Sequence, residues 1–201
     1  MQHSLFTDQQ DVSPTVEGLR HIASYISKAE EAKLIEYIDT QPWQHDLKRR
    51  VQHYGYRYDY KARRVTPDFK IGPLPDWIMT VGRKLADEGL MSGVPDQAIA
   101  NEYLPGQGIS PHIDCVPCFG NEIVSLSLGS SCVMDFSNAD AGHKASILLQ
   151  PCDLIVLSGP ARYQWLHGIA GRKTDHVNGV TIHRQRRLSL TFRKVILADA
   201  T

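Results

Sequence analysis

The sequence predicts a mainly β fold with flanking helices, arranged as a sandwich or barrel. Short alternating or apolar segments, separated by loops that contain Pro and Gly, fill the chain from about residue 97 onward. Two segments with helical spacing of apolar residues precede them, so helices do not alternate with strands as they would in βαβ units. The 201 residues are enough for one sizeable core, and we therefore expect one domain.

The N-terminal half is expected to contribute a terminal segment and two helices. Residues 1–18 are polar, which predicts a loose segment ahead of a single domain at residues 19–201. Residues 29–40 carry apolar residues at three-residue spacing with charges opposite, which is typical of an amphipathic helix that ends before Pro42. Residues 75–89 show the same pattern and predict the second helix.

The expected strands follow the second helix at short intervals. They cover residues 97–104, 122–128, 131–136, 146–150, 153–158, 161–166 and 187–197. The last strand alternates without a fault, because one face carries Arg187, Ser189, Thr191 and Arg193 while the other carries Leu188, Leu190 and Phe192. Its polar face is expected to line a site.

A second motif, His112-Ile113-Asp114, points to the chemistry of that site. Alternation along a strand would place His112 and Asp114 on the same side, with Ile113 turned into the core. His167 follows in the chain as a third candidate ligand. Two histidines and one carboxylate hold iron(II) on one face and leave other positions open for oxygen chemistry. His-x-Asp is common at turns by chance, so the prediction rests on its combination with the arginine strand.

The two arginines of the last strand suit an acidic ligand. Their Cα atoms are about 20 Å apart along the strand, so both long side chains would have to lean toward one small molecule. A guanidinium binds a carboxylate through two hydrogen bonds and stays charged at any pH, so a dicarboxylate fits this arrangement. The alternative is a surface edge strand with two solvated arginines.

Together these residues resemble the AlkB family of iron(II)- and 2-oxoglutarate-dependent dioxygenases. The resemblance runs from about Arg49 to Lys194, most of the chain. The family motifs appear in order as Asn101-Glu102-Tyr103, His112-Ile113-Asp114, His167, and Arg187 to Arg193. The fold that this resemblance implies is a double-stranded β-helix, or jelly roll.

The resemblance also implies roles for individual residues. Iron(II) would be held by His112, Asp114 and His167, with 2-oxoglutarate and O2 as cosubstrates. The residues implied at the cosubstrate are Arg187, Tyr103 and Ser189 at its distal carboxylate, and Arg193 and Asn101 near its metal-bound end. Arg193 would also pair with Asp114 and is counted with the three ligands as catalytic. Oxidation of an N-methyl base by this chemistry would release formaldehyde.

Charge and aromatic residues point to the substrate. The net charge is zero, yet residues 48–64 hold seven basic residues against Asp59 alone, and residues 162–194 hold eight against Asp175 alone. A basic face indicates a polyanion partner. Tyrosines at positions 54, 56, 58 and 60 alternate with other residues, which predicts a strand with one aromatic and one mainly charged face, and they could stack on bases. The alternative is that two or three of them face the core.

The resemblance places a substrate-recognition lid at about residues 48–70, here called the lid segment. The residues predicted to bind substrate are Arg49, Arg50, Tyr54, Tyr56, Arg57 and Tyr58. The expected function is oxidation of alkylated or modified nucleobases in DNA or RNA. A base within a duplex cannot reach a recessed iron, so the partner would be single-stranded nucleic acid or a flipped base.

Two departures from the DNA-repair branch of the family favour an alternative function. That branch has an acidic residue soon after His-x-Asp that reads a cationic methylated base, and here Cys115, Val116 and Pro117 follow. Its bulky aromatic stacker is replaced near Arg49 or Arg50. The segments 108–114, 122–130 and 191–195 look closer to the branch that hydroxylates a modified wobble uridine in tRNA.

The alternatives to base dealkylation are therefore a tRNA wobble-nucleoside hydroxylase and a non-catalytic nucleic-acid-binding jelly roll. A protein-side-chain hydroxylase is a further alternative, which the basic lid segment does not support. Four cysteines suit a reducing compartment, and Cys115 and Cys118 lack a second ligand pair for zinc, so two loop thiols are predicted. No leader or apolar run of about eighteen residues is visible. We expect a cytoplasmic monomer without membrane contact.

Overall fold

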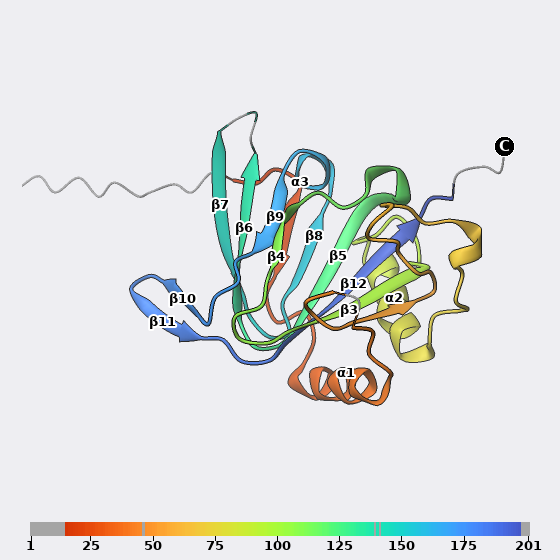
Figure 1. Ribbon diagram of the computed structural model, residues 1–201, viewed down its shortest axis with the longest axis horizontal. Helices are drawn as coiled ribbons and strands as arrows, with labels where there is room; N and C mark the ends of the chain where they lie inside the picture. Colours follow the sequence, from red (N-terminus) through yellow and green to blue (C-terminus); the bar gives the residue numbers. More distant parts are fainter. Residues whose placement is uncertain (1–14, 46, 139, 141, 198–201) are drawn as a thin grey trace, which may run out of the picture.

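The chain folds into two large antiparallel sheets that face each other and a separate two-stranded hairpin, as the computed structural model shows for residues 15–45, 47–138, 140 and 142–197 (Figure 1). The six-stranded sheet has the order β1 (Leu19–Ile22), β8 (Leu154–Leu157), β5 (Phe119–Gly129), β12 (Arg187–Val195), β3 (Gln97–Tyr103) and β2 (Val51–Tyr54). The four-stranded sheet has the order β4 (Ile109–His112), β9 (Leu166–Ile169), β6 (Cys132–Asn138) and β7 (His143–Leu149). The predicted mainly β jelly roll is confirmed.

Two helices cover the outer face of the six-stranded sheet. Helix α1 (Lys28–Thr40) begins at Ser27, whose side chain forms a capping box with Glu30. Helix α2 (Asp76–Asp87) lies on the side of this sheet opposite the four-stranded sheet (Figure 1). Both bury apolar residues in one core that also contains Leu188, Leu190 and Phe192 of β12. These helices match the two that the sequence predicts, to within two residues at each end.

A second core lies between the sheets and leaves room for a site. It contains Phe119 and Ile123 of β5, Ile155 of β8, and Phe136 of β6, among other apolar side chains. Strand β12 is paired antiparallel with β5 on one side and with β3 on the other. The alternative of a solvent-exposed edge strand is therefore excluded, and the polar face of β12 points between the sheets.

Two predicted strands differ from the structure. The expected strand at 161–166 is instead the short helix α3 (Gly159–Tyr163), which has Pro160 in its first turn, where proline is compatible with a helix. The alternating tyrosine strand ends at Tyr54, because Gly55 has a φ of +78° and a Cβ atom there would lie 1.9 Å from the Asp96 carbonyl oxygen. The chain then turns through the one-turn helix η1 (Pro67–Phe69).

The predicted loose segment 1–18 falls mostly outside the described residues, since description begins at residue 15. Val16 is buried in the core between the sheets. The Gly18 carbonyl accepts hydrogen bonds from the backbone N–H and the hydroxyl of Ser158. Among the described residues, no helix has the length and apolar character to cross a membrane.

The hairpin of β10 (Thr174–Val177) and β11 (Val180–His183) is held by a buried ion-pair cluster. Asp175 is fully buried and accepts hydrogen bonds from Arg172, from Arg184 through Nε and Nη2, and from the Val133 backbone N–H. Burial alone would raise the pKa of Asp175, but Arg184 and Arg172 outweigh it and hold the pKa below its ordinary value. The carboxylate is therefore charged in the folded protein.

We predict that Asp175→Asn lowers the free energy of unfolding by roughly 3–5 kcal/mol at pH 6, because Arg184 would remain buried without its counter-ion. The stabilisation is complete above the ordinary carboxyl pKa of about 3.9 and is lost as the pH falls through the lower folded value. Urea unfolding at several pH values checks this, with the exposed Asp87→Asn as a control. A wild-type advantage that persists unchanged at pH 2 would contradict it.

Candidate metal centre

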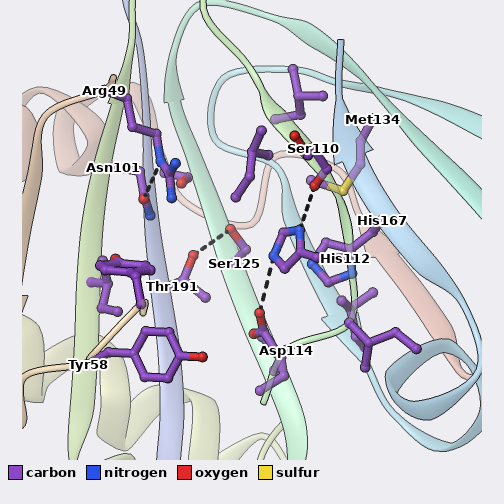
Figure 2. Close-up of a pocket in the computed structure, with 18 of the residues that line it drawn as sticks. Arg49, Tyr58, Asn101, Ser110, His112, Asp114, Ser125, Met134, His167 and Thr191 are labelled. Carbon is purple, nitrogen blue, oxygen red and sulfur yellow. Dashed lines mark hydrogen bonds and ion pairs between the residues drawn. The ribbon is translucent and has the colours of Figure 1, made fainter. Parts of the chain in front are cut away.

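Strand pairing brings His112, Asp114 and His167 together between the sheets. His112 at the end of β4 is the register partner of His167 on β9, and their ring centroids are 4.5 Å apart. Asp114 follows two residues later, with its Oδ1 3.4 Å from His112 Nε2 (Figure 2). One potential ligand atom from each residue lies within 4.8 Å of the others. This spacing suits three ligands on one face of a metal ion.

Ile113 departs from the prediction that it turns into the core. Strand β4 ends at His112, so strict alternation does not continue past that residue. Ile113 is half-buried, lines the cavity beside the histidines, and accepts a hydrogen bond from Arg63 at its carbonyl oxygen.

The protonation states of the cluster favour a bound cation. Burial by itself disfavours the charged form of Asp114, but Arg193 and the two histidines outweigh it and hold its pKa well below the usual range. Burial lowers the pKa of His167 to about 4, so this imidazole is neutral at neutral pH. His112 Nδ1 lies 2.9 Å from the Ser110 carbonyl, which favours the tautomer that leaves the Nε2 lone pair free.

Arg193 holds the Asp114 carboxylate in place from the central strand. Its Nε donates to Asp114 Oδ2 at 3.0 Å, and the two side chains are 11% and 8% exposed. The predicted pair between the last arginine of the strand and the carboxylate is therefore present. Because Asp114 Oδ2 is engaged by Arg193, Oδ1 is the oxygen directed toward His112.

The cluster opens into a cavity of about 540 Å³ that both sheets line. The polar face of β12 contributes Arg187, Ser189, Thr191 and Arg193, and β3 contributes Asn101 and Tyr103. Arg187 Nη2 donates to Ser127 Oγ at 2.9 Å, and its guanidinium lies 5.4 Å from the Tyr103 ring centroid. All five residues predicted to contact a cosubstrate therefore face one cavity.

Several buried polar atoms of this cavity have no hydrogen-bond partner within the described part of the chain. They are His167 Nδ1, Arg187 Nε and Arg193 Nη1. Buried polar groups are normally paired, so unsatisfied donors on two arginines that face one cavity indicate an anionic ligand. A metal ion held by the histidines and Asp114, together with a dicarboxylate, fits these residues.

The predicted substrate residues divide into two groups. Arg49 and Tyr58 line the cavity, and Arg49 Nε donates to Asn101 Oδ1 at 2.9 Å (Figure 2). Arg50, Tyr54, Tyr56 and Arg57 do not line it. The prediction is wrong for Tyr54, which lies in the core beneath the helices, meets the edge of Trp77 and donates its hydroxyl proton to Gln52.

The other three residues are occupied elsewhere or point away from the cavity. Arg50 forms two hydrogen bonds with the buried Glu102 and stacks over Trp43. Tyr56 packs against the core between the sheets, and Arg57 is exposed. Arg63 and Tyr60 also line the cavity, although neither is among the six predicted substrate residues. The run of basic residues at positions 61–64 could have identified Arg63 from the sequence.

The second basic region, residues 162–194, does not form a basic face. Arg162 is buried, Arg172 and Arg184 pair with Asp175, and Arg187 and Arg193 face the cavity. Arg186 pairs with Asp39 and Glu102, and Lys194 pairs with Asp96. The linear charge count was misleading here because most of these cations are buried, face the cavity or pair with a carboxylate within the fold.

Several basic residues of the lid segment are not neutralised by a carboxylate of the described residues. Lys48, Arg57, Lys61, Arg63 and Arg64 form no ion pair with a carboxylate of the described residues. The carboxylate of Asp59 accepts hydrogen bonds from the backbone N–H groups of residues 61 and 62. A net positive segment therefore borders the mouth of the cavity.

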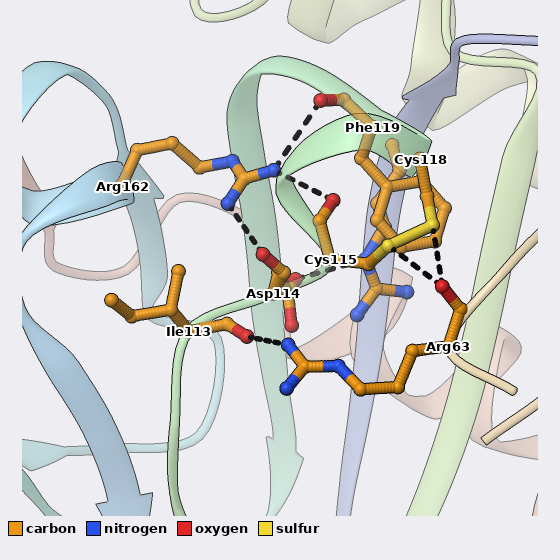
Figure 3. The surroundings of a disulfide bond; sticks show 8 residues. Arg63, Ile113, Asp114, Cys115, Cys118, Phe119 and Arg162 are labelled. Carbon is orange, nitrogen blue, oxygen red and sulfur yellow. Dashed lines mark hydrogen bonds and ion pairs between the residues drawn. A yellow bond between two sulfur atoms is a disulfide. The ribbon is translucent and has the colours of Figure 1, made fainter. Parts of the chain in front are cut away.

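Cys115 and Cys118 form a disulfide beside Asp114, so the prediction of two loop thiols is wrong (Figure 3). The one-turn helix η2 (Val116–Cys118) brings their Cα atoms within 5.3 Å. Their sulfur atoms lie 3.2 and 3.3 Å from the Arg63 carbonyl oxygen. The disulfide therefore connects the Asp114 loop with the lid segment. Cys132 and Cys152 are free and buried.

Comparison with known proteins relates this chain to a protein family. Residues 18–193 match the model of the 2OG-Fe(II) oxygenase superfamily. The uncharacterised protein L905 of Acanthamoeba polyphaga mimivirus is 36% identical over 89% of this chain and 85% of its own length. The mouse protein named tRNA (carboxymethyluridine(34)-5-O)-methyltransferase ALKBH8 is 38% identical over 89% of this chain, which spans 30% of that protein.

A solved structure supports the fold independently. The structure of OsALKBH1 superimposes with a TM-score of 0.64 at 17% identity, covering 88% of this chain and 98% of that one. At this level of identity the likeness concerns the arrangement of the strands.

We predict that His167→Ala weakens Mn(II) binding by more than the roughly 100-fold that loss of an outer-shell partner can cost, because it removes one of three direct ligands. Isothermal titration without oxygen measures the dissociation constant. His176→Ala, on the exposed side of β10, is the matched control and should bind Mn(II) as the wild type does. Equal affinity of the His167 variant and the wild type would rule out this site.

Proposed function

The chain belongs to the 2OG-Fe(II) oxygenase superfamily and to its AlkB family, and on that premise we propose that it oxidises modified nucleobases in nucleic acid. The His112, Asp114 and His167 cluster opens into the same cavity as the Arg187 guanidinium, whose buried Nε has no hydrogen-bond partner among the described residues, beside a lid segment with five cations that form no ion pair. A metal, a dicarboxylate and a polyanion each have a matching group of residues.

The chemistry of the side chains determines which residues we assign to the metal and which to the cosubstrate. We assign Fe(II) to His112, Asp114 and His167, and 2-oxoglutarate to the cavity lined by β12. When bound, these groups and O2 supply oxidation of a substrate C–H bond to C–OH, coupled to conversion of 2-oxoglutarate to succinate and CO2.

The chain's own contribution is positioning and charge. Arg187, oriented by Ser127, would bind the distal carboxylate of the cosubstrate through two hydrogen bonds. Arg193 holds Asp114 ionised and fixed. Tyr103 lies beside the Arg187 guanidinium, while Asn101 is engaged by Arg49 on the lid side. The assignment of Ser189 rests on its place in the same row of β12 side chains.

The lid segment is assigned to the nucleic acid. Its five unpaired cations would contact phosphates, which contribute much of the affinity of such complexes and make it fall with salt. Tyr58 lines the cavity and offers an aromatic face to a base that has left its stack. The alternative of a protein-side-chain substrate gains no support from this basic lid segment.

The charge of the cavity favours a neutral base over a cationic one. Its charged lining residues are Lys48, Arg49, Arg63, Arg187 and Arg193 against the single acid Asp114. No other carboxylate of the described residues lines it to receive a positively charged methylated base. This favours the second candidate function, hydroxylation of a tRNA wobble uridine. The name of the mouse relative concerns that nucleoside, although this chain spans only part of that protein.

We predict that the protein forms succinate only with Fe(II), 2-oxoglutarate and a modified nucleic acid. The panel contains 1-methyladenine as a cationic base, N6-methyladenine as a neutral one, and tRNA with modified wobble uridines. Mass spectrometry reads substrate and product, and formaldehyde separates demethylation from stable hydroxylation. Neutral bases should react at least about tenfold faster, which corresponds to 1.4 kcal/mol. His112→Ala that retains activity would refute catalysis at this site, and preference for 1-methyladenine would refute the charge argument.

We predict that Arg187→Lys raises the dissociation constant of 2-oxoglutarate about tenfold or more. A hydrogen bond to a charged group contributes about 1.5–3 kcal/mol, and 1.4 kcal/mol is tenfold in affinity. Pyruvate, a 2-oxo acid without the distal carboxylate, should bind both proteins equally. Titration in the presence of Mn(II) measures both ligands, with Arg186→Lys as the control variant. Equal weakening of both 2-oxo acids would contradict the assignment of Arg187.

A further inference from the structure

Arg162 is a buried arginine whose guanidinium binds one loop through its backbone. Its side chain is among the largest that are fully buried, with 1% exposure. Nη1 donates to the Asp114 carbonyl at 2.8 Å, and Nη2 donates to the carbonyls of Cys115 and Phe119 (Figure 3). Nε donates to the carbonyl of Gly120. Four of its five N–H groups therefore engage residues 114–120, the loop that begins at a candidate metal ligand.

No carboxylate among the described residues forms an ion pair with Arg162. Burial of a cation without a counter-ion is unfavourable, and burial accordingly lowers the pKa of Arg162. Arg184 offers a contrast within the same chain, because it is also buried but binds both oxygens of Asp175. The planar fork of Arg162 thus serves to hold backbone carbonyls, which no apolar side chain could do.

Arg162 also lies where two ligand-bearing segments meet. It belongs to α3, five residues before His167, and α3 leads directly into β9. Its guanidinium reaches the loop that carries Asp114, whose side chain Arg193 holds from the opposite strand. The backbone of one ligand and the segment of another are therefore joined by a single side chain.

We propose that Arg162 is a positioning residue that fixes the separation of Asp114 and His167 and so sets the affinity and geometry of the metal centre. The inference rests on the proposed function, since it concerns the metal site of that proposal. Arg162 touches neither metal nor substrate, and it acts through the loop of residues 114–120.

Two substitutions distinguish the role of the planar guanidinium of Arg162 from the role of its positive charge. Arg162→Lys keeps a positive charge but replaces the planar fork with one ammonium group, which cannot reach four carbonyls spread over a loop. Arg162→Met removes both. Arg184→Lys is the matched control, because it alters a buried arginine at similar depth that does not line the metal cavity.

The test compares metal binding with stability. Mn(II) titration gives the dissociation constant, the ligand-field absorption of bound Co(II) reports the coordination geometry, and thermal unfolding without metal gives the stability. Arg162→Lys should weaken Mn(II) binding about 10- to 100-fold and change the Co(II) spectrum. Arg162→Met should weaken binding at least as much. Arg184→Lys should lower the melting temperature. It should leave the Mn(II) affinity within about twofold of wild type, because substitutions at sites without shared partners act largely independently.

Loss of the positioning role can be told apart from failure of the proposed metal site. If wild-type protein binds no Mn(II), the proposed metal site itself is wrong. If wild type binds Mn(II) and both Arg162 variants bind it equally well with an unchanged Co(II) spectrum, only the positioning role is overturned. Failure of both Arg162 variants to fold while Arg184→Lys folds would also overturn it, because Arg162 would then be a residue required for the fold itself.

Discussion

The fold and the candidate site both depend on strand β12, one face of which packs in the apolar core while the other lines the cavity. Strand β12 is hydrogen-bonded to β5 and β3 along its length, so its side chains must alternate between the two sides of the sheet. One side joins the helices in an apolar core, and the other presents Arg187 and Arg193 to the cavity. A shift of one residue in its register would place leucines at the metal and arginines in the core, so fold and site are specified by the same pairing.

The placement of charge follows from the need to compensate buried ions. Asp114 is ionised between the sheets because Arg193 and the two histidines face it. Most basic residues of the C-terminal region have carboxylate partners within the fold, whereas five of the lid segment, Lys48, Arg57, Lys61, Arg63 and Arg64, have none among the described residues. This division separates cations that hold the scaffold together from cations that remain for a polyanion, a distinction that the net charge of zero conceals.

Local periodicity made much of this predictable. Alternation identified β12 and its polar face, helical spacing identified α1 and α2, and residue type identified His112, Asp114 and His167 as candidate ligands. Non-local structure was less accessible, because burial of the Arg162 charge depends on contacts with carbonyls more than forty residues away. The tyrosine pattern failed for a local reason, since a glycine with positive φ ends β2. The disulfide required knowledge of a tight turn that the Cys-x-x-Cys spacing alone does not supply.

The central claim is that one metal ion and one dicarboxylate share the cavity between the sheets. Crystals grown without oxygen in the presence of Mn(II) and 2-oxoglutarate, with anomalous scattering used to locate the metal, test it most directly. We expect one Mn(II) bound by His112, Asp114 and His167, with the distal carboxylate of 2-oxoglutarate against Arg187. A metal bound elsewhere, or a cosubstrate whose distal carboxylate lies away from Arg187, would show that the metal and the dicarboxylate do not share this cavity in the way we propose.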